Sequence, residues 1–419
     1  MKLLKTNQTY RHLIFATLFS TFGDSIYYIA LLTYASQFEN ATLAITLVSL
    51  SETLPYLLGV VTGGLADQSR NKNRKLIMMG ASRGLLYGIV GILMGFQQSL
   101  LLLGGIITIN FISDIIGKYA SGLTIVFYPY IVKGEDLEEA QGLSGALQQT
   151  ASIAAGFIGA FLIGIFSYQV MAWLNSLMFW AVMVMMLVLS PKLHQIEKES
   201  LTVTESQSLK AFFQDILSAL KILKQQQLLF RALLLLAVAN GFLSLLSPLI
   251  SIYFSQYPHL IVGNFALMIA LMQGIFAVGI IAGNLLGAKL AKNLSLMFIC
   301  QLIFLSLTLI SLSLMMQSIP FVYLSSIMAT FLCGVASPKL SALLLKSIPV
   351  AQLGTVSGGV NTILMATAPM MTILFTTIIT ALGLKTGLSL FMVSSGLCLG
   401  IIKFLPQQVN VEKSTNMVK

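Results

Sequence analysis

The chain has 419 residues, of which 57% are apolar and 9% are charged. Soluble domains carry about 25% charged residues, so a water-soluble fold is excluded and lipid must surround most of this surface. The net charge of +10 does not indicate nucleic-acid binding, because the basic residues stand in short loops between apolar runs. The three cysteines and three histidines lack the spacing of a metal site or a disulfide framework, so we expect no metal and no cofactor.

Twelve apolar stretches are long enough to cross a bilayer as helices, which takes about 20 residues each. They lie at residues 11–36, 42–66, 74–97, 100–127, 138–166, 168–190, 228–254, 262–290, 294–316, 319–346, 352–381 and 385–405. The predicted fold class is therefore an all-α membrane protein with twelve transmembrane helices. The first stretch continues to Ser36 without a small-residue cleavage site, so we expect a span there and not a cleaved signal peptide.

The basic residues predict which side of the membrane the termini face. Twelve crossings put both termini on one side, and twenty of the 24 Lys and Arg fall in the termini or loops of that side. Lys385 falls on the opposite side, and three more lie within spans: Arg83, Lys118 and Lys339. Cytoplasmic loops collect Lys and Arg, so we predict a multi-pass protein of the cell membrane with both termini in the cytoplasm.

One long polar segment divides the chain into two halves of six spans. We predict an N-terminal six-helix bundle at 1–190, a cytoplasmic linker at 191–227, a C-terminal six-helix bundle at 228–406 and a cytoplasmic tail at 407–419. The first part of the linker, HQIEKESLTVTESQS, is predicted to be solvated, and an amphipathic interfacial helix is predicted to follow from Leu209. Two parallel halves of this kind are typical of secondary transporters. The matching span ends GVVTGGLAD and GNLLGAKLA support an internal repeat.

The loop after span 2 resembles a known signature. The run GGLAD at 63–67, followed by the basic residues before span 3, is similar to the loop 2–3 motif of the major facilitator superfamily, although Gln68 replaces the usual basic residue. Three segments are most similar to the macrolide-efflux-like drug exporters of bacteria: FSTFGDSIYYIAL, YPYIVKGEDLEEAQGL and IPVAQLGTVSGGVNTILMATAPM. Span 5 keeps part of the antiporter glycine pattern without its proline. The resemblance implies the major facilitator fold and efflux of drug-like compounds.

The same loop is a candidate gate. A carboxylate at the end of span 2, among cations, can latch the cytoplasmic side of two bundles in one state. We assign the gating loop to Gly63, Asp67, Arg70 and Arg74. The alternative is that the basic residues only hold the loop inside the cell, and for Lys72 and Lys75 we favour that reading.

Three acids lie within spans, where a charge is costly and usually faces a bundle interior or a watery cavity: Asp24, Glu52 and Asp114. Asp24 lies ~20 Å along span 1, and Glu52 ~15 Å into span 2, so both reach the middle of the membrane. Neither has a basic residue within one helical turn, and loss of water favours the neutral form of a carboxyl group. Either acid could carry the proton that drives exchange; the alternative is a structural acid held by hydrogen bonds.

The basic residues inside the spans can also be explained by structural roles. Asp114 and Lys118 are four apart on one helix, so we predict an ion pair between them, and Arg83 should reach a depth similar to that of Lys118. A substrate or coupling role for these three is the alternative. Lys339 follows Pro338 near a span end and is predicted to extend toward the interface.

These features favour a proton-coupled exporter of amphipathic or cationic small molecules, working by alternating access as a monomer in the lipid bilayer. A dedicated carrier of one solute, such as a peptide, sugar or siderophore, is the alternative. A membrane enzyme or receptor is disfavoured because we see no nucleophile–base pair, no metal constellation and no sizeable extramembrane domain. Polar span positions could line the pathway: Gln148, Gln149, Asn175, Asn240, Gln273 and Asn361.

Overall fold

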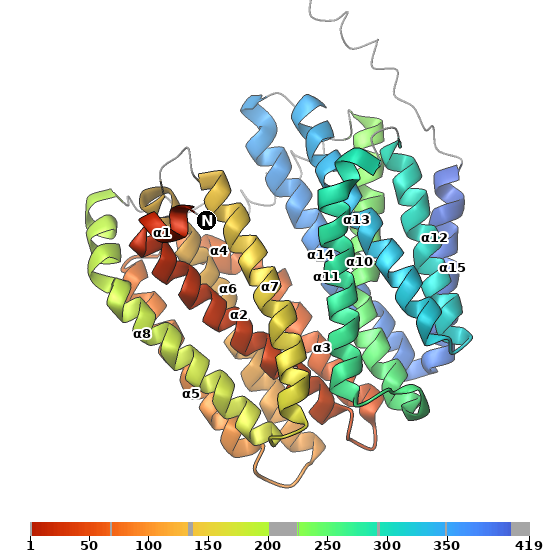
Figure 1. Ribbon diagram of the computed structural model, residues 1–419, viewed down its shortest axis with the longest axis horizontal. Helices are drawn as coiled ribbons and strands as arrows, with labels where there is room; N and C mark the ends of the chain where they lie inside the picture. The colour runs from red at the N-terminus through yellow and green to blue at the C-terminus, as the bar shows by residue number, and fades with distance from the viewer. Residues whose placement is uncertain are drawn as a thin grey trace, which may run out of the picture. The chain divides into compact units, whose positions relative to one another are not determined.

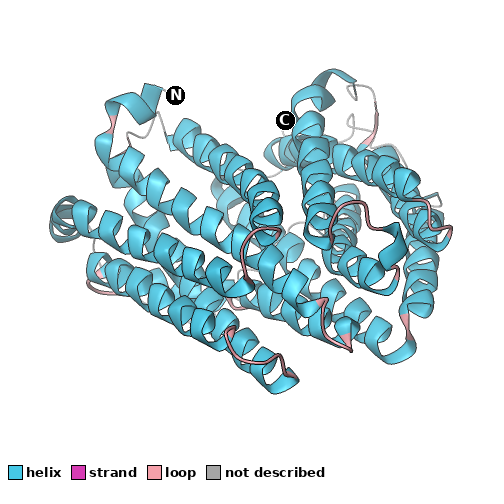
Figure 2. Cartoon of the chain, turned by 60° about the horizontal axis from the view of Figure 1, so that its bottom comes forward, coloured by secondary structure: helices cyan, strands magenta, loops and turns pink. Residues whose placement is uncertain are grey.

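The protein was analysed as a computed structural model that describes residues 2–67, 69–132, 137–200, 224, 226–290, 294–347 and 350–403. Within these ranges all regular secondary structure is helical (Figure 2). The helices are α1 (Lys2–Thr6), α2 (Gln8–Ala35), α3 (Ala41–Leu57), α4 (Gly59–Asp67), α5 (Lys72–Leu93), α6 (Leu100–Ile131), α7 (Leu137–Ile163), α8 (Tyr168–Ser200), α10 (Gln227–Gln256), α11 (Phe265–Leu290), α12 (Leu296–Met315), α13 (Ile319–Ser347), α14 (Val350–Leu382) and α15 (Leu384–Lys403), with a short 3-10 turn, η2 (Pro258–Leu260).

The predicted spans coincide with these helices, which confirms the all-α membrane fold class. Eleven of the described helices are long and apolar enough to cross a membrane. The remaining span, predicted at 42–66, is divided into α3 and α4 by a break at Leu58. Pro55 lies inside α3 and removes one backbone donor, and Gly59 begins α4, so the sequence itself weakens the helix at this point.

The chain forms two compact units. Unit 1 consists of Met1–Leu209 together with Pro248–Gly274, and unit 2 consists of Lys210–Ser247 together with Ile275–Lys419. The joined ends of α10 and α11 therefore pack with unit 1, where Ala266 and Ala270 meet Ile29 of α2 and Ala160 of α7. The domain boundaries expected from the sequence stay a prediction.

Unit 1 is built around α2, α5 and α8 (Figure 1). Helix α5 packs along α8, α2 packs against both α7 and α8, and α6 contacts α3, α4 and α5. Glycines allow the close approach of α5 to α8: a Cβ on Gly84 or Gly91 would lie about 3 Å from the indole of Trp180 or Trp173. The Tyr10 hydroxyl, buried in the core, donates to the Ala140 carbonyl at 2.6 Å. This packing fixes the positions of the side chains that α2, α5 and α6 direct inward.

In unit 2, α12 packs against α13 and α15, and α14 packs against α15. Phenylalanine rings fill the space between the helices; Phe242 of α10 makes an edge contact with Phe391 of α15 at a centroid distance of 4.8 Å. Helices α11 and α13 cross at glycines, since a Cβ on Gly283 would lie 2.1 Å from the Phe331 carbonyl oxygen. Such a crossing tolerates no side chain.

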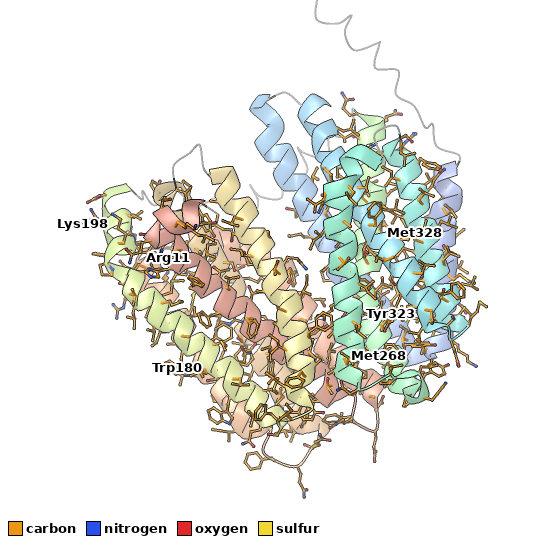
Figure 3. The ribbon with its side chains drawn as sticks, in the orientation of Figure 1. Arg11, Trp180, Lys198, Met268, Tyr323 and Met328 are labelled. Atoms are coloured by element: carbon orange, nitrogen blue, oxygen red, sulfur yellow. The ribbon has the colours of Figure 1, made fainter. Side chains whose placement is uncertain are left out.

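The predicted solvated linker needs a correction at its beginning. Helix α8 continues through Pro191 to Ser200, because Leu193 and Ile196 are buried in the core of unit 1 and carry the helix onward. Figure 3 shows Lys198 on this extension at the same end of unit 1 as Arg11 of α2, with Trp180 farther along α8. Residues 201–223, which hold most of the predicted amphipathic helix, and the predicted tail at 407–419 lie outside the described residues.

Candidate functional site

A cluster of charged side chains lies inside unit 1, where three helices meet. The Nη2 atom of Arg83, on α5, donates to both carboxylate oxygens of Asp24 on α2, at 3.0 and 3.2 Å. The same nitrogen lies 3.5 Å from Oδ1 of Asp114 on α6. Asp24 has no basic residue within one helical turn, but it has a cationic partner 59 residues away in the sequence.

Arg83 has further contacts besides the two carboxyl groups. Its Nε donates to the Ser113 hydroxyl at 2.9 Å, and its guanidinium carbon lies 3.9 Å from the ring centre of Phe179 on α8. Arg83 is only 5% exposed. A buried arginine with a carboxylate, a hydroxyl and an aromatic face is fixed in one geometry, which makes it the centre of the cluster.

Glu52, on α3, joins the cluster through Asn110. The Asn110 side-chain amide donates to Glu52 Oε1 at 3.0 Å and to Asp114 Oδ2 at 3.3 Å. Its oxygen accepts from the Tyr87 hydroxyl at 3.0 Å, so the amide group must point its donors at the two carboxyl groups. Asn110 thereby connects Glu52 and Asp114 through hydrogen bonds from one amide group.

The predicted ion pair between Asp114 and Lys118 is wrong. Among the described residues the recorded partner of the Lys118 ammonium is the ring of Tyr56, whose centre lies 3.3 Å away. Asp114 instead faces Arg83 and Asn110. Spacing on one helix favours such a pair only weakly, and a buried guanidinium on a neighbouring helix is the stronger partner.

The described part of the cluster holds more carboxyl groups than paired cations. The cluster has three acids and one guanidinium, which contacts Asp24 and Asp114. The Asp24 side chain is 37% exposed, whereas that of Asp114 is 13% exposed. A carboxylate out of water needs a cation, a hydrogen-bond donor or a proton. The arrangement can therefore bind and release a proton, and Asp24 is more accessible than Asp114.

The predicted gating loop is held by Lys72, a residue for which the sequence favours only a role in keeping the loop inside the cell. Lys72 is 4% exposed, and its ammonium donates to the carbonyl oxygens of Ala66 and Ser69, both at 2.7 Å. Glu197, on the extension of α8, accepts from the backbone N–H of Lys72 at 2.6 Å. The end of α4 and the beginning of α5 are thus both capped by charged groups.

The other predicted gating residues are placed less centrally. Arg70 and Arg74 are exposed. Gly63 lies against Gly122 of α6, where α4 and α6 approach closely. Asp67 ends α4, and its side chain lies outside the described part of the structure. Lys339 donates to the Leu294 carbonyl oxygen near the end of its helix.

A cavity of about 390 Å³ lies within unit 1, between α2, α5, α6, α7 and α8. Arg83 and Gly117 line one part of it, and Tyr128 and Gln148 line another. Of the polar span positions named from the sequence, Gln148 is on this wall, and Asn175 is buried with neither amide atom hydrogen-bonded to a described residue. Asn240 donates to the Leu364 carbonyl, and the Asn361 side chain lies outside the described residues.

Several residues of the site were missed from the sequence. Asn110 stands one turn before Asp114 on the same apolar helix, so its spacing could have identified it. Ser113, Tyr87 and Phe179 gave no such signal, because they meet Arg83 or Asn110 through packing between helices. The described residues contain no group of three or more His, Cys, Asp or Glu side chains placed to hold a metal ion.

A bundle of membrane-length helices with ionisable side chains in its interior is typical of a polytopic helical membrane protein. The profile of the Major Facilitator Superfamily matches residues 13–372, and the chain belongs to this family of transporters. It is a transporter and not an enzyme.

Solved structures agree with this fold. The chain is similar to the nucleoside transporter NupG, with a TM-score of 0.68 and 12% identity over 94% of this chain and 99% of that one. It is also similar to a bacterial homologue of the iron transporter ferroportin in an inward-facing state, with a TM-score of 0.67 and 14% identity over 94% and 98% of the chains. A peptide transporter of the POT family in complex with alafosfalin gives a TM-score of 0.63 and 14% identity over 95% and 94%. At these identities the likeness shows the fold alone. No curated protein matches the sequence.

Proposed function

We propose that this transporter exports amphipathic or cationic small molecules in exchange for protons, by alternating access. In this proposal it acts as a monomer in the cell membrane, with both termini in the cytoplasm, and the proton gradient is its energy source without any cofactor. The observation that carries the proposal is the excess of carboxyl groups over paired cations around Arg83.

The excess supports proton exchange for an electrostatic reason. Arg83 can neutralise one of the three carboxyl groups, and Lys118 contacts an aromatic ring. A second and third negative charge at this depth favour a bound proton over a bare carboxylate. The Asp24 side chain is more exposed than that of Asp114, so a proton or a substrate can reach Asp24 more readily than Asp114.

The distribution of acids along the chain points to the same half of the protein. From residue 216 to residue 411 the sequence contains no Asp and no Glu. Carboxyl-based proton coupling inside the spans must therefore rest on Asp24, Glu52 and Asp114. We assign these three residues, with Arg83, to coupling.

A dedicated carrier of one solute, working in either direction, is the second candidate. It is favoured by the range of solved structures with this fold, which includes a nucleoside transporter and peptide transporters. The resemblance of three segments to macrolide-efflux-like exporters favours the first candidate. A panel containing macrolides, cationic dyes, dipeptides and sugars separates the two: an exporter should move several unrelated amphiphiles, whereas a dedicated carrier should move one class.

The test is transport into inside-out vesicles under an imposed pH gradient, with each variant normalised to folded protein. Asp24→Asn should abolish gradient-driven transport while retaining some substrate binding, and Glu52→Gln should have a similar or milder effect. Glu39→Gln, an exposed acid between α2 and α3, is the matched control and should transport like the parent. If Asp24→Asn and the Asp24→Asn/Glu52→Gln double variant both couple to protons like the parent, the coupling assignment is wrong.

A further inference from the structure

The cavity inside unit 1 has two chemically different walls. Helices α5 and α8 contribute an apolar wall that includes Leu76, Met79, Val182 and Met186. Helices α2, α6 and α7 contribute a second wall, whose polar side chains include Thr17, Ser121, Thr124, Ser144 and Gln148. A molecule that fits both walls must itself be apolar along one face and polar along the other.

The polar wall offers mainly hydrogen-bond acceptors. The hydroxyl groups of Ser121 and Thr124 donate to carbonyl oxygens of their own helix, at 3.0 and 2.9 Å, so their remaining capacity is to accept. The Gln148 amide donates to Ser144 Oγ at 2.9 Å, which leaves its oxygen for a ligand. Hydroxyl groups along one edge of a ligand would satisfy this wall. The wall extends along α6 from Gly117 to Tyr128, eleven residue steps or ~16 Å.

One end of the cavity presents a donor whose charge is already neutralised. The Nη2 and Nε atoms of Arg83 serve Asp24, Asp114 and Ser113. The recorded bond of Nη1, among the described residues, is a long one of 3.4 Å to Ser20. A guanidinium nitrogen carries two N–H groups at this position, so Nη1 has donor capacity for a ligand acceptor.

Gly117 keeps that nitrogen accessible. A Cβ at Gly117 would lie 3.0 Å from Nη1 of Arg83, tighter than most real contacts of a side chain. The residue type at this position therefore leaves space beside the one guanidinium nitrogen with unused donor capacity.

Charge decides which acceptor fits there. A cationic end group offers Nη1 no acceptor, and none of the lining residues is an acid that could pair with it. An anionic group meets the carboxylates of Asp24 and Asp114, which already occupy the far side of the guanidinium. An uncharged carbonyl oxygen meets neither penalty.

We propose that this cavity binds uncharged, facially amphipathic molecules that carry hydroxyl groups along one edge and a carbonyl acceptor at the end that meets Arg83 Nη1. The inference rests on the proposed function, in that it makes this cavity a substrate site and narrows the substrate class to uncharged amphiphiles.

Three probes with one steroid body test the end group. Methyl cholate is apolar on one face, hydroxylated on the other and ends in an ester carbonyl; cholate ends in a carboxylate, and a trimethylammonium derivative of the same body ends in a cation. Isothermal titration into the purified full-length protein in dodecyl maltoside should give methyl cholate an affinity at least about tenfold higher than either charged probe. The cation offers Nη1 no acceptor, and the carboxylate meets the carboxylates of Asp24 and Asp114. Methyl lithocholate, with two fewer hydroxyl groups, should bind more weakly than methyl cholate.

Two threonines of α6 give a matched pair of variants. Thr124 lines the cavity and Thr108 is exposed, and both donate to the carbonyl four residues earlier. Thr124→Phe fills the cavity and should lower the affinity for methyl cholate at least about tenfold, whereas Thr108→Phe should leave this affinity unchanged. Gly117→Ala and Gln148→Leu are milder changes, and each should lower the affinity for methyl cholate severalfold. They replace Thr124→Phe in the test if that variant does not fold.

The proposal is overturned if a charged probe binds as tightly as methyl cholate, or if the folded cavity variants bind it like the parent. Since the titration involves no pH gradient, its outcome is independent of proton coupling. If Asp24→Asn loses proton coupling but a charged probe binds as tightly as methyl cholate, this binding site is rejected and proton exchange is supported. If Asp24→Asn keeps proton coupling but methyl cholate binds most tightly, the coupling assignment is rejected and this binding site is supported.

Discussion

At the scale of single residues, Arg83 determines how the acids of unit 1 are arranged. Its guanidinium contacts two carboxyl groups, a hydroxyl and an aromatic ring from three other helices, α2, α6 and α8. Removal of such a partner leaves buried carboxylates uncompensated, and the cost of an unpaired buried charge is about 3–5 kcal/mol. Because Asp24 is partly exposed, water recovers some of that cost.

We therefore expect Arg83→Gln to lower the stability of the folded protein by about 3 kcal/mol or less. Asp24→Asn in the same chain should restore part of the loss, since it removes one of the stranded charges. Thermal unfolding of the purified protein measures both effects. Arg74→Gln, on the exposed side of the same helix, is the control, and an Arg83→Gln protein that unfolds at the parental temperature would contradict the arrangement.

Residue-scale contacts are also where the sequence was least informative. The depths of Asp24 and Glu52 follow from counting residues along a span. The partner of Asp24 does not, because Arg83 reaches it through the packing of α2 and α5, and this packing leaves no local pattern. The Asp114–Lys118 spacing predicted a pair that a stronger neighbour displaced.

At the scale of elements, charged groups join α4, α5 and α8 at one end of unit 1. Lys72 caps the carbonyl end of α4, and Glu197 caps the amino end of α5. The loop between α4 and α5 is thereby tied to the extension of α8 that leads into the linker.

We expect Lys72→Met to destabilise the protein, because a buried ammonium with two carbonyl acceptors contributes about 1.5–3 kcal/mol per charged hydrogen bond at most. Arg74→Met, two residues later and exposed, should have little effect on the unfolding temperature. If transport falls in Lys72→Met at unchanged stability, the lysine acts in gating alone. Equal unfolding temperatures and equal transport in both variants would show that the cap is dispensable.

The crossing of α11 and α13 gives a second prediction at this scale. Gly283→Ala places a Cβ 2.1 Å from a backbone oxygen, so the helices must separate, and overpacking of this kind costs about 1–3 kcal/mol. Gly400→Ala, on α15, meets nothing within 4 Å and should be neutral or slightly stabilising. The yield of monodisperse protein by size-exclusion chromatography compares the two. A parental yield for Gly283→Ala would contradict the close contact between these two helices.

Helix positions could be predicted because the length of an apolar run is set by the thickness of the bilayer. The break at Leu58 could not, since Pro55 allows either a kink or an interruption. The helical extension of α8 through Glu197 was hidden by its polar sequence. Leu193 and Ile196 support it, but two buried positions are too few to distinguish a helix from a linker before packing is known.

At the scale of the whole molecule, topology is the property that the basic residues predict. Arg11 and Lys198 lie at one end of unit 1, and twenty Lys and Arg are predicted to share their side of the membrane (Figure 3). We expect Lys198→Cys to be inert and Gln97→Cys, in the loop between α5 and α6, to react with a membrane-impermeant thiol reagent in intact cells. Both variants are made in a chain without Cys300, Cys333 and Cys398. The reverse labelling pattern would invert the orientation.

The absence of acidic residues from 216 to 411 has a consequence for how such a protein can change over generations. If coupling rests on Asp24, Glu52 and Asp114 as we propose, the other half of the chain is free to accumulate substitutions without disturbing the energy source. New cargo could then be acquired by exchanging that half as a module. A chimaera that keeps the first 200 residues and takes its later spans from another member of the superfamily should inherit the ion specificity of this chain and the cargo of its donor.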